Sequence, residues 1–172
     1  MTISALAALA GVVLFPLAMV YAGLMDIVTM TIRNMLVLAL VAGWLALAPL
    51  AGFSLAELGW SVGVASVVLV LAFIMFALGW IGGGDAKLAA ATALWFSPEQ
   101  ALLYFTYASL IGGLLTLGLL ELRTWMLPTA LVRVPWIASL HDRKSGVPYG
   151  AAMAPAALLV FPETGWLTHA AL

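Results

Sequence analysis

The sequence predicts an all-α fold, a polytopic helical bundle that lies in a membrane, and three observations lead to it. Hydrophobic residues make up 66% of the 172 residues and charged residues only 8%, a balance that a water-exposed surface of this size does not tolerate. The apolar residues gather in about six runs separated by polar breaks, and most runs approach the ~20 residues that a membrane-spanning helix needs. Cysteine is absent, which excludes a disulfide framework, a thiol nucleophile and a cysteine-based zinc site.

Three membrane-spanning helices are predicted in the first half of the chain. The first covers residues 3–22, and we interpret it as a span rather than a cleaved signal peptide, because no basic segment precedes it and further apolar runs follow. The second covers residues 35–51. The third covers residues 60–81 and stops at three consecutive glycines.

A fourth, short apolar run covers residues 88–96. As a helix it would rise about 15 Å, less than the ~30 Å hydrocarbon core of a bilayer. We therefore expect this helix either to tilt in a thinned region or to begin at the glycines. Ser97 and Pro98 are typical of a helix start, and they predict the beginning of a fifth span over residues 101–120.

The last predicted span covers residues 148–161, and all six spans form one domain, residues 1–172. The connection 121–147 has mixed apolar and basic character, so we expect it to lie at the membrane surface. We also expect this connection to line the route by which a substrate enters.

Charged residues predict the orientation of the chain. With six spans, the segments 23–34, 82–87 and 121–147 fall on one side of the membrane, and these segments carry all six Lys and Arg. Basic loops face the cytoplasm, which puts both termini on the non-cytoplasmic side. The other side carries only Glu57, Glu99, Glu163 and His169. The net charge of −1 suggests no nucleic-acid partner.

Two aspartates are expected at the same cytoplasmic boundary. Asp26 closes the first span and Asp85 opens the fourth. Two nearby carboxylates in a low-dielectric setting cannot both ionise easily, so such a pair shares a proton. The ionised group can then take a proton from an attacking water while the protonated group donates to a scissile carbonyl oxygen. The sequence therefore predicts an aspartic peptidase with Asp26 and Asp85 as its catalytic pair, and no metal or organic cofactor.

Residues beside these aspartates could support the same chemistry. Lys87 could offset charge or hold an acidic substrate side chain, and Asn34 could cap a helix and bind. An extended substrate backbone could approach Asp85 closely at three residues without side chains, namely Gly82, Gly83 and Gly84. A structural reading stays open, in which Asp26 is a boundary residue and Asp85 is the N-cap of the fourth helix.

Three motifs resemble those of the type IV prepilin peptidases, membrane aspartic proteases with a Gly-x-Gly-Asp motif. Here that motif reads Gly82-Gly83-Gly84-Asp85 and continues Ala86-Lys87-Leu88. The family's first aspartate is followed by Ile-Pro-Asn, and this chain has Asp26 and then Ile32-Arg33-Asn34, with Arg33 in place of the proline. Near the end, Pro148-Tyr149-Gly150 is similar to the Pro-Tyr-Gly signature that opens the family's last helix.

The resemblance implies that Asp26 and Asp85 are catalytic, with Pro148, Tyr149 and Gly150 as supporting residues. It implies a prepilin or pseudopilin substrate with a short basic leader in the cytoplasm and a hydrophobic helix in the bilayer. The enzyme would lie in the bacterial inner membrane with its active site facing the cytoplasm. The short chain, without a methyltransferase-type region, resembles the peptidase-only branch associated with Flp/Tad-type pilus assembly.

Other functions remain open at this point. An intramembrane protease of other transmembrane substrates can also use a Gly-x-Gly-Asp aspartate, although Pro148-Tyr149-Gly150 argues against it. A small proton-coupled carrier could bind protons at Asp26 and Asp85, but carriers usually place such residues near the bilayer midplane and often contain an internal repeat. A non-catalytic subunit of a secretion machine would give the aspartates no reason to pair.

Overall fold

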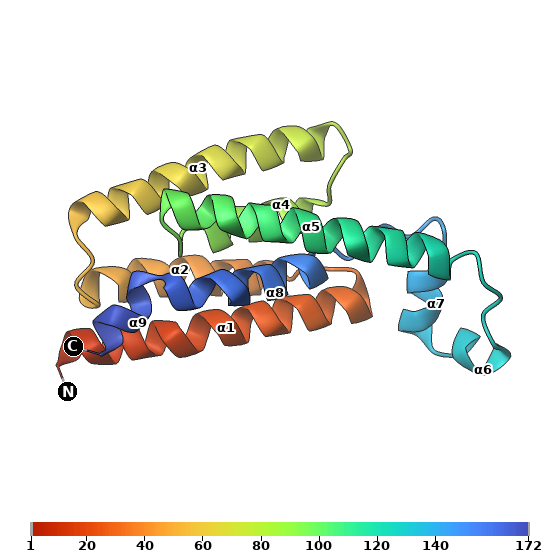
Figure 1. Ribbon diagram of the computed structural model, residues 1–172, viewed down its shortest axis with the longest axis horizontal. Coiled ribbons are helices and arrows are strands. Elements are labelled where there is room, and N and C mark those ends of the chain that lie inside the picture. The colour runs from red at the N-terminus through yellow and green to blue at the C-terminus, as the bar shows by residue number, and fades with distance from the viewer. Residues whose placement is uncertain (1, 172) are drawn as a thin grey trace.

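The predicted all-α fold class is confirmed by a computed structural model, which describes residues 2–171; Met1 and Leu172, the ends of the predicted domain, lie outside them. The described chain forms α-helices and one 3₁₀ helix (Figure 1). In chain order they are α1 (Ile3–Thr29), α2 (Asn34–Leu50), α3 (Leu55–Ala77), α4 (Gly83–Ala93), α5 (Pro98–Leu122), α6 (Thr129–Val132), α7 (Pro135–His141), α8 (Gly150–Val160), η1 (Phe161–Glu163) and α9 (Gly165–Ala170).

Helix α8 lies along the middle of the bundle. It packs between α1 and α5, while α2 packs against α1, and α4 packs against α3 (Figure 1). The N- and C-terminal ends of the described chain lie together at one end of the bundle. The α1–α2 turn, the α3–α4 connection and the short helices α6 and α7 lie at the other end.

Each of the six predicted apolar runs contains a helix, but the number of membrane spans stays a prediction. Within the described residues, three helices are long and apolar enough to cross a membrane, namely α1, α3 and α5. Helix α2 is shorter, as is the segment Gly150–Glu163. The protein is therefore an all-helical membrane protein in which long helices accompany shorter ones.

The first helix is longer than predicted. It continues past residue 22 to Thr29, and it ends where Met30 takes a left-handed backbone conformation at φ 52°. The polar residues do not end the helix because Asp26 is buried in it and finds a hydrogen-bond partner elsewhere in the chain. A local pattern could not anticipate that long-range contact.

The short helix α4 includes two of the three glycines. It begins at Gly83, with Gly82 as its N-cap. Of the two arrangements expected from the sequence, the helix that begins at the glycines is therefore the one observed. The residues from Leu88 to Ala93 are all buried. Protein therefore surrounds most of this helix, which need not match the thickness of a bilayer.

The predicted start of the fifth helix is confirmed. The Ser97 hydroxyl accepts from the Gln100 N–H, and the Gln100 side chain accepts in return from the Ser97 N–H. Pro98 is the first helical residue. Ser54 and Glu57 cap α3 in the same reciprocal way, so two donors are satisfied at each start.

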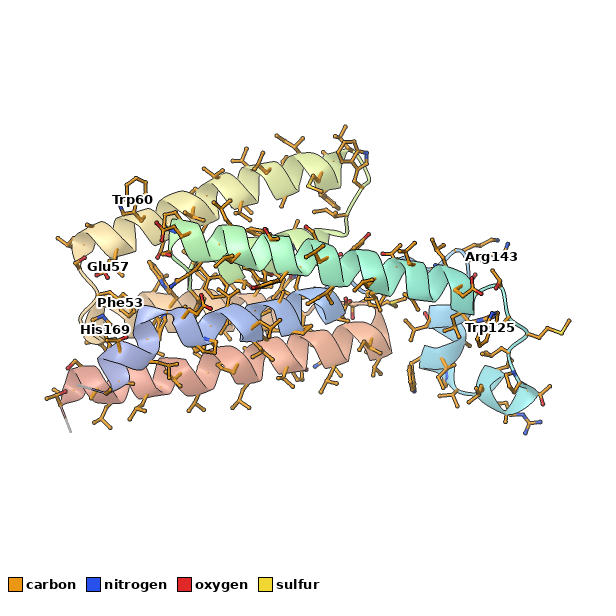
Figure 2. All side chains as sticks on the ribbon, viewed as in Figure 1. Phe53, Glu57, Trp60, Trp125, Arg143 and His169 are labelled. Carbon is orange, nitrogen blue, oxygen red and sulfur yellow. The ribbon has the colours of Figure 1, made fainter. Side chains whose placement is uncertain are left out.

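The basic segments of the chain gather at one end of the bundle. Figure 2 shows Trp125 and Arg143 at the end formed by α6 and α7. Glu57 and His169 lie at the opposite end, near the chain termini. The three basic segments therefore share one end of the molecule, while the side of the membrane that this end faces stays a prediction.

Candidate active site

A cavity of about 670 Å³ lies where the α1–α2 turn, the α3–α4 connection and the segment before α8 meet. Nine of the ten sequence-predicted site residues line it, and the tenth, Gly150, contacts one of them. The lining residues are Asp26, Met30, Thr31, Ile32, Asn34, Gly79, Trp80, Ile81, Gly82, Gly83, Gly84, Asp85, Lys87, Gly146, Val147, Pro148 and Tyr149. Segments far apart in the sequence thus form one site.

Asp26 lies in the last turns of α1 and is only 4% exposed. Its Oδ2 atom accepts a hydrogen bond of 2.7 Å from the backbone N–H of Gly150, the first residue of α8. The first N–H groups of a helix have no partner within the helix, and the helix dipole favours a negative charge there. The start of α8 therefore stabilises the charged form of Asp26.

The absence of a side chain at Gly150 permits this contact. A Cβ atom at position 150 would lie 2.9 Å from Oδ2 of Asp26 and 3.0 Å from its Cβ, too close for either group to stay in place. One turn back along α1, a Cβ atom on Gly23 would meet the Cβ of Ala154 at 2.8 Å. Helices α1 and α8 therefore approach each other closely because both have glycine at the contact.

Tyr149 and Pro148 connect this contact to the rest of the site. Pro148 is buried in the cavity wall, and Tyr149 lines the cavity while its ring packs on Gly112 of α5. The three residues of the Pro-Tyr-Gly motif thus form a wall, a contact with α5 and a hydrogen bond to Asp26.

Asp85 lies in the first turn of α4 and is partly buried. The N-cap of this helix is Gly82, so the alternative in which Asp85 is itself the N-cap is wrong. Both carboxylates line the same cavity, near enough for the charge of one to act on the other. Asp26 contacts the N-terminus of α8 and Asp85 lies in the first turn of α4, and a helix N-terminus favours a negative charge. Mutual repulsion between the two carboxylates favours a shared proton.

The three glycines before Asp85 are packed against the protein's own atoms. A Cβ atom would lie 2.9 Å from Oδ2 of Asp85 if placed on Gly82, and 3.2 Å from the Cβ of Ile32 if placed on Gly84. On Gly83 it would lie 3.2 Å from the ring of Phe76. A side chain at any of these positions would therefore displace a neighbouring atom, and substrate access at this point stays a prediction.

Lys87 and Asn34 contact each other at the exposed edge of the site. The Lys87 Nζ atom donates to the Asn34 Oδ1 atom at 3.2 Å, which joins α4 to the start of α2. Arg33, rather than Asn34, is the N-cap residue of α2. The amide of Asn34 therefore joins two helices, and its predicted role as a cap is wrong.

Several lining residues were not anticipated from the sequence. Gly146 and Val147 directly precede the Pro-Tyr-Gly motif, and only this proximity in the sequence could have indicated that they line the cavity. Trp80 and Ile81 end the predicted third span, but the helix stops at Ala77 and Gly79 turns the chain at φ 75°. Among residues 2–171, no three His, Cys, Asp or Glu side chains lie close enough together to hold a metal ion.

Fold and site together define a helical membrane protein with two carboxylates in one cavity at one end of its bundle. A comparison with models of protein families narrows this class. The model of the type IV leader peptidase family matches residues 13–117, more than half of the chain, and the protein belongs to that family. The match includes Asp26 and Asp85, whereas the Pro-Tyr-Gly motif lies beyond it.

The resemblance to the type IV prepilin peptidases is thereby confirmed, and membership of the family implies a peptidase. Neither the curated proteins nor the solved structures contain a match to the chain.

Proposed function

We propose that this protein is a membrane aspartic endopeptidase that removes the leader peptide of type IV prepilins or pseudopilins of the Flp/Tad kind. Cleavage occurs at the cytoplasmic boundary of the bacterial inner membrane. The observation that carries the proposal is the meeting of Asp26 and Asp85 in one cavity, in a chain of the type IV leader peptidase family. Basic residues gather at the same end of the bundle, which supports the cytoplasmic orientation.

The two carboxylates have different partners, and these suggest their roles. Asp26 accepts the Gly150 N–H, which favours its ionised form, so Asp26 is the base that takes a proton from the attacking water. Asp85 carries the shared proton and donates it to the carbonyl oxygen of the scissile peptide. The tetrahedral intermediate then collapses and the C–N bond breaks. The proton held by Asp26 passes to the departing amine, and a hydroxyl group of the intermediate returns a proton to Asp85 as the carbonyl re-forms.

An apolar groove beside the cavity supports a substrate with a hydrophobic helix. The groove encloses about 430 Å³ between α3, α4, α5 and α8, and it shares Trp80, Ile81, Asp85 and Tyr149 with the first cavity. Small residues in its walls include Ala72, Ala89, Ala108 and Gly112, and such residues let helices approach closely in lipid. A substrate helix along this groove would present its cytoplasmic end to Asp85.

The test is co-expression with candidate prepilins, with leader removal scored by a gel shift. The wild type is expected to cut, and Asp26→Asn and Asp85→Asn are expected to fail while they reach the membrane at wild-type levels. Asp142→Asn is the matched control, because Asp142 is an exposed aspartate that directly follows α7, a helix at the same end of the bundle. Cleavage that survives in either of the first two variants would overturn the paired-aspartate mechanism.

A further inference from the structure

Arg123 is a buried arginine at the end of α5. It is 9% exposed and forms the C-cap of that helix. Its Nε atom donates to the carbonyl oxygen of Leu140 at 2.8 Å, and its Nη2 atom donates to that of Gly146 at 2.9 Å. Burial of a charged group is costly unless it is hydrogen-bonded. Here two guanidinium N–H groups donate to backbone carbonyls, one in the last turn of α7 and one in the connection before α8.

This connection leads directly into the site. Gly146 lines the cavity, as do the three residues that follow it, and the next residue, Gly150, donates to Asp26. Between His141 and Gly150 the chain contains no regular helix, so contacts with the rest of the protein set its path. The bond to Gly146 joins that path to the end of α5, and the bond to Leu140 joins the end of α5 to α7, just before the path begins.

We propose that Arg123 is a positioning residue for the reaction. Its guanidinium holds the carbonyls of Leu140 and Gly146, and thereby sets the position of the cavity wall and of the N–H that Asp26 accepts. This inference rests on the proposed function. It differs from the role of a topology anchor, because a basic residue that anchors a loop acts from the aqueous or headgroup region, whereas Arg123 is buried.

The first experiment measures cleavage kinetics on purified protein in bilayers. Arg123→Ala is expected to lower kcat roughly 10- to 100-fold, the order of effect of a small misplacement of reacting groups, with little change in KM. Arg123→Lys should recover part of the loss, since an ammonium group is a point donor without the planar fork of arginine. Arg133→Ala removes the same charge from an exposed position in the same connection and should match the wild type.

The second experiment needs no substrate. The chain has no cysteine, so spin labels can be placed at introduced cysteines on Ser145 and on Leu120, which is exposed on α5. The wild type and Arg133→Ala are expected to give one narrow distance distribution. Arg123→Ala should give a broad one, and Arg123→Lys an intermediate one.

The two experiments together decide whether Arg123 is a positioning residue. A broad distribution with reduced kcat in Arg123→Ala supports the positioning role. A narrow distribution in Arg123→Ala overturns it, whatever the kinetics, and so does a broad distribution with wild-type kcat. If the wild type cleaves no prepilin, the proposed function fails, while the distance measurement still tests whether Arg123 holds the connection.

Discussion

The two ends of the bundle are stabilised by different kinds of contact. At the end that carries the chain termini, aromatic rings pack in a buried core, with the centroids of Phe15 and Phe161 4.5 Å apart and those of Trp95 and Trp166 4.7 Å apart. At the site end, single hydrogen bonds and glycine contacts join the helices. Stability should therefore depend most on the aromatic end, and activity most on the site end.

The largest expected effect is the loss of activity without a loss of stability at the site end. Asp26→Asn and Asp85→Asn should each reduce cleavage roughly 10²- to 10⁴-fold, the contribution of a positioned acid or base. The side chain keeps its shape, and an amide oxygen at position 26 can still accept the Gly150 N–H. Thermal unfolding in detergent should stay close to that of the wild type; a large drop in either variant would mean that the carboxylates also stabilise the fold.

The opposite result is expected for Trp166→Ala at the aromatic end. Trp166 is 1% exposed and packs on Trp95 and Phe53. Its truncation leaves a cavity and should lower the free energy of unfolding by roughly 3–5 kcal/mol, measured by chemical or thermal unfolding in detergent. Cleavage per folded molecule should be unchanged. If this ratio falls as steeply as the stability, the two ends are not independent.

Gly150→Ala should affect both quantities, because α8 belongs to the site and to the packed bundle. The added methyl group would meet Asp26 at 2.9 Å, so we expect a loss of roughly 1–3 kcal/mol together with reduced kcat. Gly113→Ala is the control, since a Cβ atom at that helical position meets nothing within 4 Å. A wild-type kcat in Gly150→Ala would contradict the expectation that cleavage needs the close approach of α8 to Asp26.

The smallest expected effect belongs to Arg33→Pro. Arg33 has φ −70°, close to the value that a proline ring fixes, and it is exposed. The rigid turn that the family's proline implies is therefore available to this chain with an arginine. The substitution should keep cleavage and raise the free energy of unfolding by about 0.4–1 kcal/mol. A destabilised variant would show that the turn needs the Arg33 N–H or side chain.

Helix positions could be predicted where local chemistry determines them. The apolar runs and the Ser97-Pro98 start predicted helices that the structure contains. The predicted end of α1 was wrong because the hydrogen-bond partner of Asp26 is 124 positions away in the sequence, beyond the reach of any local pattern.

Most residues of the candidate site could also be predicted, because local sequence motifs contain them. Its aspartates, glycines and Pro-Tyr-Gly residues belong to motifs that can be recognised one by one, and the structure brings them together. Arg123 could not be found in this way. In the sequence it is one basic residue among several in a connection, and its burial depends on how that connection folds against α5.

The bond between Asp26 and Gly150 also has a consequence for biogenesis. Helix α1 contributes the carboxylate, and the start of α8, far later in the chain, contributes the N–H that binds it. A nascent chain inserted only as far as α5 already holds both aspartates but lacks the wall formed by Pro148 and Tyr149. The cavity is thus complete only after α8 has joined α1 to α5, all of which precede it in synthesis.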